Sequence, residues 1–463
     1  MERKSEYGNK NEVEEMIDVL NKSDNMAAQM AAGAYFRKLL ASRRPPPLRA
    51  LLASDRLIPA LIGCLYRSTM PDLQLDAAWA ITNIACGSQS ETHQVVHHGG
   101  ISALLLVAQT SPDAELCSQA IWGLGNIAAD CFRCKALLRD AGLFETIALL
   151  LTSHPPQSAA NYHRHRHHYL HPLRTGIWCL ANLCRGGVHT FDGNLIRTIV
   201  QMMTEVIVSA DFADDSELLA DACWVIAYIA DDIAIGLQAV LDEQRLVRQL
   251  VANLSKMDDR RVLSGSLRTI GNLITGNDEQ TLSVLNHQVL PHLLKLLERS
   301  WGHIQREAAW TISNVAAGSP EHIEILFAVD GMFNALLDAL FTGEVKLRKE
   351  VGWALANALT GGAYERILCL SMSGVVPALC SLIDNNTDRR LTERSLNALD
   401  AACRVDSAFT AMLRQCGGLN VVQRLILQTA DVVLKEKAIR LVANFLPTLV
   451  PPKADLLYSF VRN

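Results

Sequence analysis

CSQAIWGLGNIAAD (117–130) is the stretch that decides the fold, because its Trp-x-x-x-Asn centre recurs along the chain. Its apolar residues stand three or four positions apart, as in Ile121, Leu124 and Ala128, and this spacing predicts a helix. The related stretches are LDAAWAITNIACG (75–87), LRTGIWCLANLCRG (173–186), ADACWVIAYIADD (220–232), SGSLRTIGNLITG (264–276), QREAAWTISNVAAG (305–318) and RKEVGWALANALTG (348–361).

The leading position of these stretches repeats with a period in the low forties. It is occupied by Trp79, Trp122, Trp178, Trp224, Arg268, Trp310 and Trp353, at spacings of 43, 56, 46, 44, 42 and 43. Such a period is typical of armadillo or HEAT repeats. One repeat cannot bury its apolar face alone, so neighbours must stack. We therefore predict an all-α, right-handed superhelical solenoid of about ten armadillo repeats over residues 12–447.

Three segments fall outside the regular repeats. We expect a flexible N-terminus at 1–11, a C-terminal tail at 448–463, and an exposed inter-repeat loop at 154–172. The loop, HPPQSAANYHRHRHHYLHP, carries six of the fourteen histidines. Metal binding by such a tract is the alternative to a solvated loop.

Composition limits the classes of protein further. Hydrophobic residues make up 49% of the chain and charged residues 20%, which excludes a disordered protein. The net charge of −5 argues against direct binding of nucleic acid. The twelve cysteines are scattered singly, as expected for reduced thiols. Neither a signal peptide nor an uninterrupted apolar run of about 18 residues occurs, so we expect a soluble intracellular protein.

An asparagine stands four residues after most of the repeated tryptophans, and therefore one helical turn away on the same face. These residues are Asn83, Asn126, Asn182, Asn272, Asn314 and Asn357, whereas Trp224 is followed by Tyr228. If the tryptophans were only core residues, each buried amide would need a partner of its own.

Binding of a peptide explains both residues of each pair. Parallel indoles leave slots for the aliphatic stems of Lys or Arg, and a carboxamide can clamp the backbone of an extended peptide. Carboxylates lie within seven residues of the repeated positions, where they can hold the cationic heads. They are Asp130, Glu217, Asp221, Asp231, Asp278, Glu307 and Glu350.

These stretches resemble, in order, the repeats of the importin-α (karyopherin-α) family of nuclear import adaptors, over about residues 12–447. The resemblance implies that basic nuclear localisation signals bind along the inner groove, and that the protein shuttles between cytoplasm and nucleus. It implies a major site in which the carbonyl of Gly87, the hydroxyl of Thr92 and Asp130 hold a key lysine. The other members of the major site are Trp79, Asn83, Trp122, Asn126, Trp178 and Asn182.

The resemblance also implies a minor site and a linker region between the two sites. The minor site comprises Glu307, Trp310, Ser313, Asn314, Glu350, Trp353 and Asn357. The linker region comprises Asp221, Trp224, Tyr228, Arg268 and Asn272. Arg268 replaces tryptophan there, and its charge would separate the two sites.

Some features depart from the family pattern. Cys86 stands where the family usually has serine, and the family's acidic tail is missing. The basic importin-β-binding segment is not recognisable, because Arg3, Lys4 and Lys10 are the only bases before the first repeat. We expect importin-β as a partner only if such a segment exists outside this chain. CGGL (416–419) matches the last repeat, so the surface for the recycling exportin is a further expectation.

Three rival interpretations remain. An enzyme is disfavoured because no phosphate loop, G-x-S-x-G or H-E-x-x-H occurs, and Cys131-x-x-Cys134 lacks a second pair at zinc spacing. We interpret those thiols as buried or incidental, with a redox or zinc role as the alternative, and predict no catalytic residue, cofactor, metal, nucleic acid or membrane partner. A β-catenin-type scaffold would need a basic groove. An import-inactive relative would bind basic peptides without delivering them.

Overall fold

The computed structural model describes residues 10–445, except 23, 43–47, 153–161, 187, 257, 300 and 386–387. All regular secondary structure in this part of the chain is helical, as predicted. The chain divides into two compact units, Met1–Leu246 and Val247–Asn463, and each is described by itself. The expected C-terminal tail and most of the expected N-terminal segment lie outside the described residues, although Lys10 and Asn11 already belong to the first helix.

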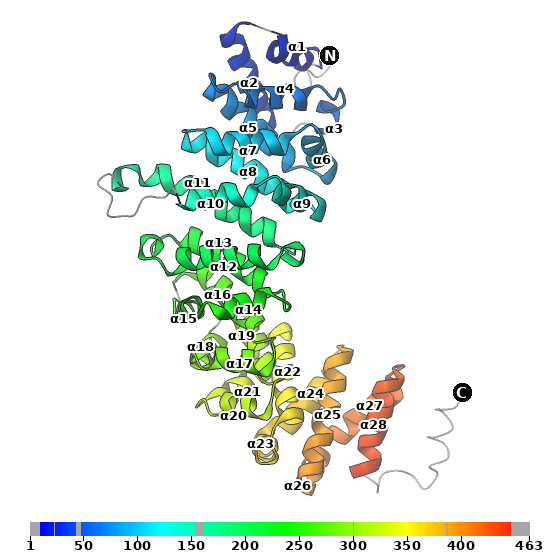
Figure 1. The fold of residues 1–463 in the computed structure, drawn as a ribbon. Helices are drawn as coiled ribbons and strands as arrows, with labels where there is room; N and C mark the ends of the chain where they lie inside the picture. Colours follow the sequence, from blue (N-terminus) through cyan, green and yellow to red (C-terminus); the bar gives the residue numbers. More distant parts are fainter. Residues whose placement is uncertain are drawn as a thin grey trace. The chain divides into compact units, whose positions relative to one another are not determined.

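The first unit begins with two helices and continues in repeats of three, stacked in layers (Figure 1). Its helices are α1 (Lys10–Lys22), α2 (Met26–Leu40), α3 (Leu48–Leu51), α4 (Leu57–Leu65), α5 (Pro71–Ala85), α6 (Gln89–His97), α7 (Gly100–Thr110), α8 (Ala114–Asp130), α9 (Phe132–Asp140), α10 (Leu143–Thr152), α11 (Tyr162–Cys184), η1 (Val188–Thr190), α12 (Gly193–Val208), η2 (Ala210–Phe212), α13 (Ser216–Ala230) and α14 (Gly236–Asp242).

The second unit continues the same pattern after α15 (Gln244–Asn253), which contains the boundary. Its helices are α16 (Arg260–Leu273), α17 (Asp278–Leu285), α18 (Val289–Leu297), α19 (Gly302–Val315), α20 (Pro320–Phe327), α21 (Met332–Thr342), α22 (Val345–Gly361), α23 (Tyr364–Leu370), η3 (Ser371–Val375), α24 (Val376–Asn385), α25 (Arg389–Val405), α26 (Ser407–Gln415), α27 (Gly418–Gln428) and α28 (Val432–Phe445). With α1 and α2 taken as one repeat, the described helices make ten, which confirms the predicted solenoid.

The repeat from Ser88 to Asp130 shows how the sequence sets these helices. Ser88 and Glu91 form a capping box at the start of α6. Gly99 has a φ of 89°, a left-handed conformation that glycine adopts without strain, and this turns the chain from α6 into α7. The Asp113 carboxylate then accepts hydrogen bonds from the N–H groups of Glu115 and Leu116 and starts α8.

The long third helices of successive repeats pack side by side within each unit. In the first unit α5 contacts α8, α8 contacts α11, and α11 contacts α13. In the second unit α16, α19, α22, α25 and α28 pack in the same sequence. Ile121, Leu124 and Ile127 of α8 are fully buried between neighbours. Residues on the remaining face of these helices therefore form a row along each unit.

The expected loop at 154–172 is too long, because α11 already begins at Tyr162 and continues through Pro172. Leu170 and Leu173 are buried, and no glycine or proline interrupts residues 157–171. A helix anchored in the core by these leucines can therefore extend toward its N-terminus. The rest of the expected loop, residues 154–161, lies outside the described residues.

One stretch, Tyr364–Asp384, is long and apolar enough to cross a membrane by length and composition alone. Its backbone is not helical at Ser373 and Gly374, so it consists of two helices, α23 and α24, joined at a turn. Just over half of its most apolar part, 56%, is buried inside the fold. Both helices pack against α25. Buried helices of a repeat meet the same criterion.

Candidate peptide-binding surface

Three tryptophans of the major site lie in a row on the neighbouring helices α5, α8 and α11. Trp79 and Trp178 are half-buried, and Trp122 keeps 44% of its surface exposed. The rings of Trp79 and Trp122 are 5.9 Å apart and tilted by 56°, so the expected parallel arrangement is wrong for this pair. Large indoles at the surface are available for a ligand, unlike the leucines and isoleucines of the core.

A glycine seats the third indole of this row. A Cβ atom at Gly125 would lie 2.9 Å from Cε3 of Trp178, so only glycine lets that ring rest on the backbone of α8. The second unit repeats the arrangement, because a Cβ atom at Gly271 would lie 3.0 Å from Cε3 of Trp310. In both cases the glycine directly precedes one of the repeated asparagines, Asn126 or Asn272.

The asparagines connect successive long helices. The Nδ2 of Asn126 donates to the carbonyl of Thr82 over 3.1 Å, and that of Asn182 donates to Gly125 over 3.5 Å. In the second unit the Nδ2 of Asn357 donates to the carbonyl of Ser313 over 3.1 Å. Each acceptor directly precedes the asparagine of the preceding repeat. These amides therefore fix the spacing of the row, a role that the sequence did not indicate.

One arginine binds the last amide of each site. Arg185 donates to Oδ1 of Asn182 over 2.7 Å, and Arg394 donates to Oδ1 of Asn357 over 2.8 Å. Both amides are thus engaged on both sides in this structure, instead of standing open as clamps. A peptide backbone can reach them only where the arginine gives way.

The Nδ2 donor of the first amide of each site has no hydrogen-bond partner among the described residues. In the described part of the chain, the buried Nδ2 atoms of Asn83 and Asn314 and the Nε1 of Trp79 have no hydrogen-bond partner. Burying an unpaired donor costs about 1–3 kcal/mol. An acceptor that reached any of these three donors would offset this cost.

A further pair of arginines borders the rows at their first tryptophans. The Arg37 guanidinium lies 5.3 Å from the ring of Trp79 and 3.1 Å from the carboxylate of Asp76. Arg268 lies 5.1 Å from the ring of Trp310 and donates to Glu307 over 2.7 Å. Each arginine occupies the tryptophan position of the preceding repeat, and each acid stands three residues before the tryptophan it accompanies.

Asp130 is the half-buried carboxylate expected in the major site. Its side chain is 11% exposed, and its Oδ2 lies 3.3 Å from Nε2 of His93 and 3.7 Å from Sγ of Cys134. Thr92 is 1% exposed and donates its hydroxyl hydrogen to the carbonyl of Ala85, which leaves the hydroxyl oxygen as an acceptor. Gly87 is exposed and lies two residues beyond the end of α5.

The acids of the minor site differ from Asp130. Glu307 is 12% exposed and already paired with Arg268, although its buried Oε2 has no partner among the described residues. Burial raises the pKa of Glu350, and the charge of nearby Glu307 raises it further. Ser313 is buried and donates its hydroxyl hydrogen to the carbonyl of Trp310.

The residues expected to form a linker region are divided between the two units. On α13 the rings of Trp224 and Tyr228 lie 5.7 Å apart, and the guanidinium of Arg185 lies 6.0 Å from Tyr228. Asp221 lies on the same helix and is half-buried, while Glu217 and Asp231 are exposed. In the second unit Arg268 is paired with Glu307 as described, Asn272 is buried, and Asp278 is exposed.

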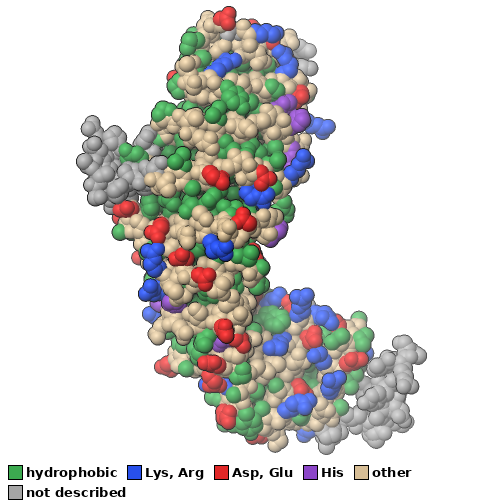
Figure 2. All heavy atoms as spheres, in the orientation of Figure 1, with side chains coloured by type: hydrophobic (Ala, Val, Ile, Leu, Met, Phe, Trp, Pro, Cys, Tyr) green, Lys and Arg blue, Asp and Glu red, His purple; other side chains and the backbone are tan. Residues whose placement is uncertain are grey.

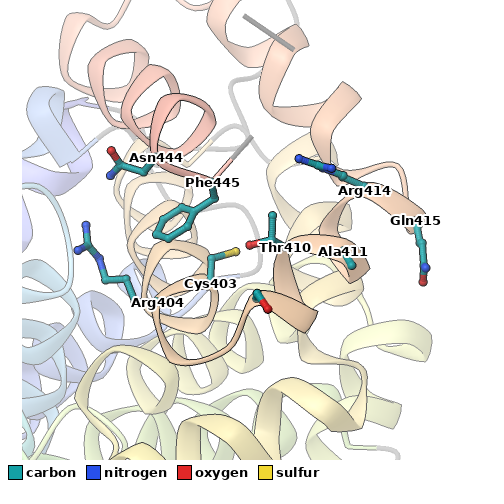
Figure 3. A pocket seen from close by; sticks show the side chains of 9 residues that line it. Cys403, Arg404, Thr410, Ala411, Arg414, Gln415, Asn444 and Phe445 are labelled. Atoms are coloured by element: carbon teal, nitrogen blue, oxygen red, sulfur yellow. The ribbon is translucent and has the colours of Figure 1, made fainter. Parts of the chain in front are cut away.

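Basic side chains gather at the end of the second unit. Figure 2 shows lysines and arginines over α24–α28 on the face in view. A hollow of about 720 Å³ between α25, α26 and α28 is lined by Arg404, Arg414 and Phe445 among others (Figure 3). It shares no lining residue with the row of tryptophans and amides.

Three-helix repeats with this arrangement define an armadillo solenoid. The armadillo/beta-catenin-like repeat family matches residues 45–86, 88–129 and 277–317. The crystal structure of an engineered protein superposes on this chain with a TM-score of 0.78 at 25% identity, covering 94% of this chain and 99% of that one.

Similar proteins of known name identify the family of armadillo proteins to which the chain belongs. Importin subunit alpha-1b of Oryza sativa subsp. japonica is 32% identical over 91% of this chain and 77% of its own length. Importin subunit alpha-5 of Arabidopsis thaliana is 31% identical over 91% of this chain and 79% of its own. The chain belongs to the importin-α family of armadillo proteins.

Proposed function

We propose that this protein is a nuclear import adaptor whose long helices bind lysine- and arginine-rich localisation signals as extended peptides. The observation that carries the proposal is the pairing of surface indoles with buried, unpartnered amide donors on α5 and α19. Exposed indoles favour the stems and heads of basic side chains, and unpaired amides favour a peptide backbone. As an adaptor of this kind the protein would act in both cytoplasm and nucleus.

In the proposed major site one lysine of the signal enters between the indoles of Trp122 and Trp178. Its ammonium reaches Asp130, and the carbonyl of Gly87 and the hydroxyl oxygen of Thr92 supply two further acceptors. The rings of Trp79 and Trp122 lie 5.9 Å apart at a tilt of 56°. A lysine or arginine side chain can therefore enter between this pair only if the rings turn. Unpartnered Asn83 takes a carbonyl of the peptide backbone.

The acids beside the row favour this proposal over a scaffold for acidic partners. Asp130, Glu307 and Glu350 are half-buried beside the rows, and among the described residues only Glu307 of the three is paired with an arginine, so an acidic peptide would meet like charge at Asp130 and Glu350. An import-inactive relative that binds the same basic peptides differs only in its transport partners. Import of a labelled basic cargo in permeabilised cells, with importin-β supplied, separates the two.

Titration calorimetry tests the peptide-binding half of the proposal. A peptide of the K-K/R-x-K/R type should bind, and Asp130→Lys should weaken it about 100-fold, because a buried charge-assisted hydrogen bond is replaced by repulsion. Asp140→Lys is the control, since Asp140 is exposed on α9 outside the row. Equal affinity of both variants and the parent protein would contradict the assignment of the major site.

A further inference from the structure

Four side chains with metal-binding chemistry converge at the junction of α6, α8 and α9. They are His93 on α6, Asp130 at the end of α8, and Cys131 and Cys134 at the start of α9. One ligand atom from each side chain lies within 4.8 Å of all the others. The set is formed by three helices of two successive repeats, so it depends on the tertiary fold and not on a single sequence motif.

Three of the six distances among the donors are those expected of a tetrahedron, and the others are no longer than 4.8 Å. His93 Nε2 lies 3.3 Å from Asp130 Oδ2 and 3.4 Å from Cys131 Sγ, and Cys134 Sγ lies 3.7 Å from Asp130 Oδ2. Bonds of about 2.0–2.3 Å from a central zinc ion would place tetrahedral nitrogen, oxygen and sulfur donors roughly 3.3–3.8 Å apart. Little rearrangement is therefore needed to enclose one ion.

The local backbone explains why the thiols converge. Cys131 is extended, with a φ of −156°, and caps α9 by accepting the N–H of Cys134 on its sulfur. This places the sulfur of Cys131 at the first turn of the helix, close to Cys134. Cys134 is buried and the other three side chains are partly exposed, so the site has a closed base and an open entrance.

We propose that His93, Asp130, Cys131 and Cys134 form a zinc site. Two thiolates and an imidazole favour zinc over magnesium or calcium, which prefer oxygen donors. Binding would release the two thiol protons to solvent and form two Zn–S, one Zn–N and one Zn–O bond. The sequence predicts buried or incidental thiols, because Cys131-x-x-Cys134 lacks a second pair at zinc spacing, whereas the fold brings His93 and Asp130 to these two cysteines.

The proposal has a regulatory consequence, and this part rests on the proposed peptide function. Asp130 cannot give its full charge to a metal ion and to a lysine of the signal at once. Zinc and a basic peptide should therefore compete, and each should lower the apparent affinity of the other by the same factor. The major site would then respond to free zinc, while the minor site, which shares none of the four ligands, would not.

Cobalt binding tests the site without reference to peptide. The reduced chain is titrated with Co²⁺, and thiolate-to-cobalt absorption is recorded, because the histidine-rich segment 154–172 can bind metal but contributes no thiolate. We expect one such ion per chain, displaced by Zn²⁺. Loss of the thiolate band is expected in the Cys131→Ser, Cys134→Ser double variant, and a weaker band in His93→Ala. Cys369→Ser is the control, because that thiol is exposed and lies in the second unit.

Absence of the thiolate band in the parent protein overturns the proposal, and so does a band that survives in the double variant. Oxidation of Cys131 and Cys134 to a disulfide in place of metal binding, read from free-thiol counts, overturns it as well. Peptide affinity measured with a chelator tests the proposed function separately. A peptide that binds equally with and without saturating Zn²⁺, while the thiolate band is present, overturns only the competition.

Discussion

The major site of the first unit and the minor site of the second are built on one plan but differ in their acids. Each has an arginine over its first tryptophan, Arg37 or Arg268, and an arginine on its last amide, Arg185 or Arg394. The major site adds a third indole and an acid, Asp130, whose neighbours are a histidine and a thiol. In both units the acid three residues before the first tryptophan, Asp76 or Glu307, is already paired with that arginine.

The comparison separates features common to the two proposed sites from features that differ between them. Indoles at a fixed spacing and bonded amides recur in both units, so they are a property of the repeat. The surroundings of the acid are not, because Glu307 pairs with Arg268 of the preceding repeat, whereas Asp130 lies beside His93 of its own repeat and Cys134 of the next. We therefore expect the major site to bind a single basic cluster more tightly than the minor site does.

Removal of indoles should have the largest effect. Trp122→Ala with Trp178→Ala should weaken a single-cluster peptide about 30- to 1,000-fold, because two stacking surfaces worth roughly 1–2 kcal/mol each are lost. Trp310→Ala with Trp353→Ala should weaken the same peptide less than tenfold. Calorimetry checks both, with Trp301→Ala as the control tryptophan outside the rows. Equal losses in the two units would remove the proposed difference.

Displacement of an indole should have the next largest effect. A methyl group in Gly125→Ala would collide with Trp178, so peptide affinity should fall about tenfold, equivalent to roughly 1.4 kcal/mol. Gly271→Ala should disturb only Trp310 and the minor site. Gly63→Ala is the matched control, because this glycine of α4 has open space at its Cβ position. If Gly125→Ala binds as Gly63→Ala does, the seating of Trp178 is irrelevant to binding.

Removal of the arginine beside the minor site should have the opposite effect and raise the affinity of that site for a basic peptide. Arg268→Ala removes a cation from Trp310 and frees Glu307, so the minor site should bind a basic peptide about three- to tenfold more tightly. The measurement uses a chain whose major site is already removed by the double tryptophan change. Arg260→Ala, which uncovers Trp301 outside the rows, should leave the affinity unchanged. Weaker binding by Arg268→Ala would show that the arginine itself contacts the peptide.

The smallest effect concerns pH. Because burial raises the pKa of Glu350, its ionisation opposes folding. Below the ordinary pKa of 4.5 the carboxyl is protonated in both the folded and the unfolded chain, so burying it does not lower the free energy of unfolding. That free energy falls as the pH rises from 4.5 through the raised pKa of the folded chain. Glu350→Gln should therefore flatten the decline of unfolding free energy with pH above 4.5, measured in urea. Glu436→Gln, an exposed change on α28, should leave the decline in place.

The sequence predicted the features that lie within one helix. Trp122 and Asn126 stand four residues apart, so any helix places them on one face, and the period of the motif gives the repeats. Contacts between repeats were not predictable in the same way. Arg37 reaches Trp79 across 42 residues, and His93 reaches Cys131 across 38, because the packing of successive helices brings them together. The early start of α11 depends on buried Leu170, whose environment the sequence does not show.

The most direct measurement is the position of a bound signal. A crystal structure of this chain with a lysine-rich peptide should place one lysine Nζ within about 2.7–3.2 Å of the Asp130 carboxylate. Its stem should lie between the rings of Trp122 and Trp178, and the peptide should be extended along the long helices. A peptide held on the outer helices, with both rings uncovered and Asp130 unengaged, would contradict the account.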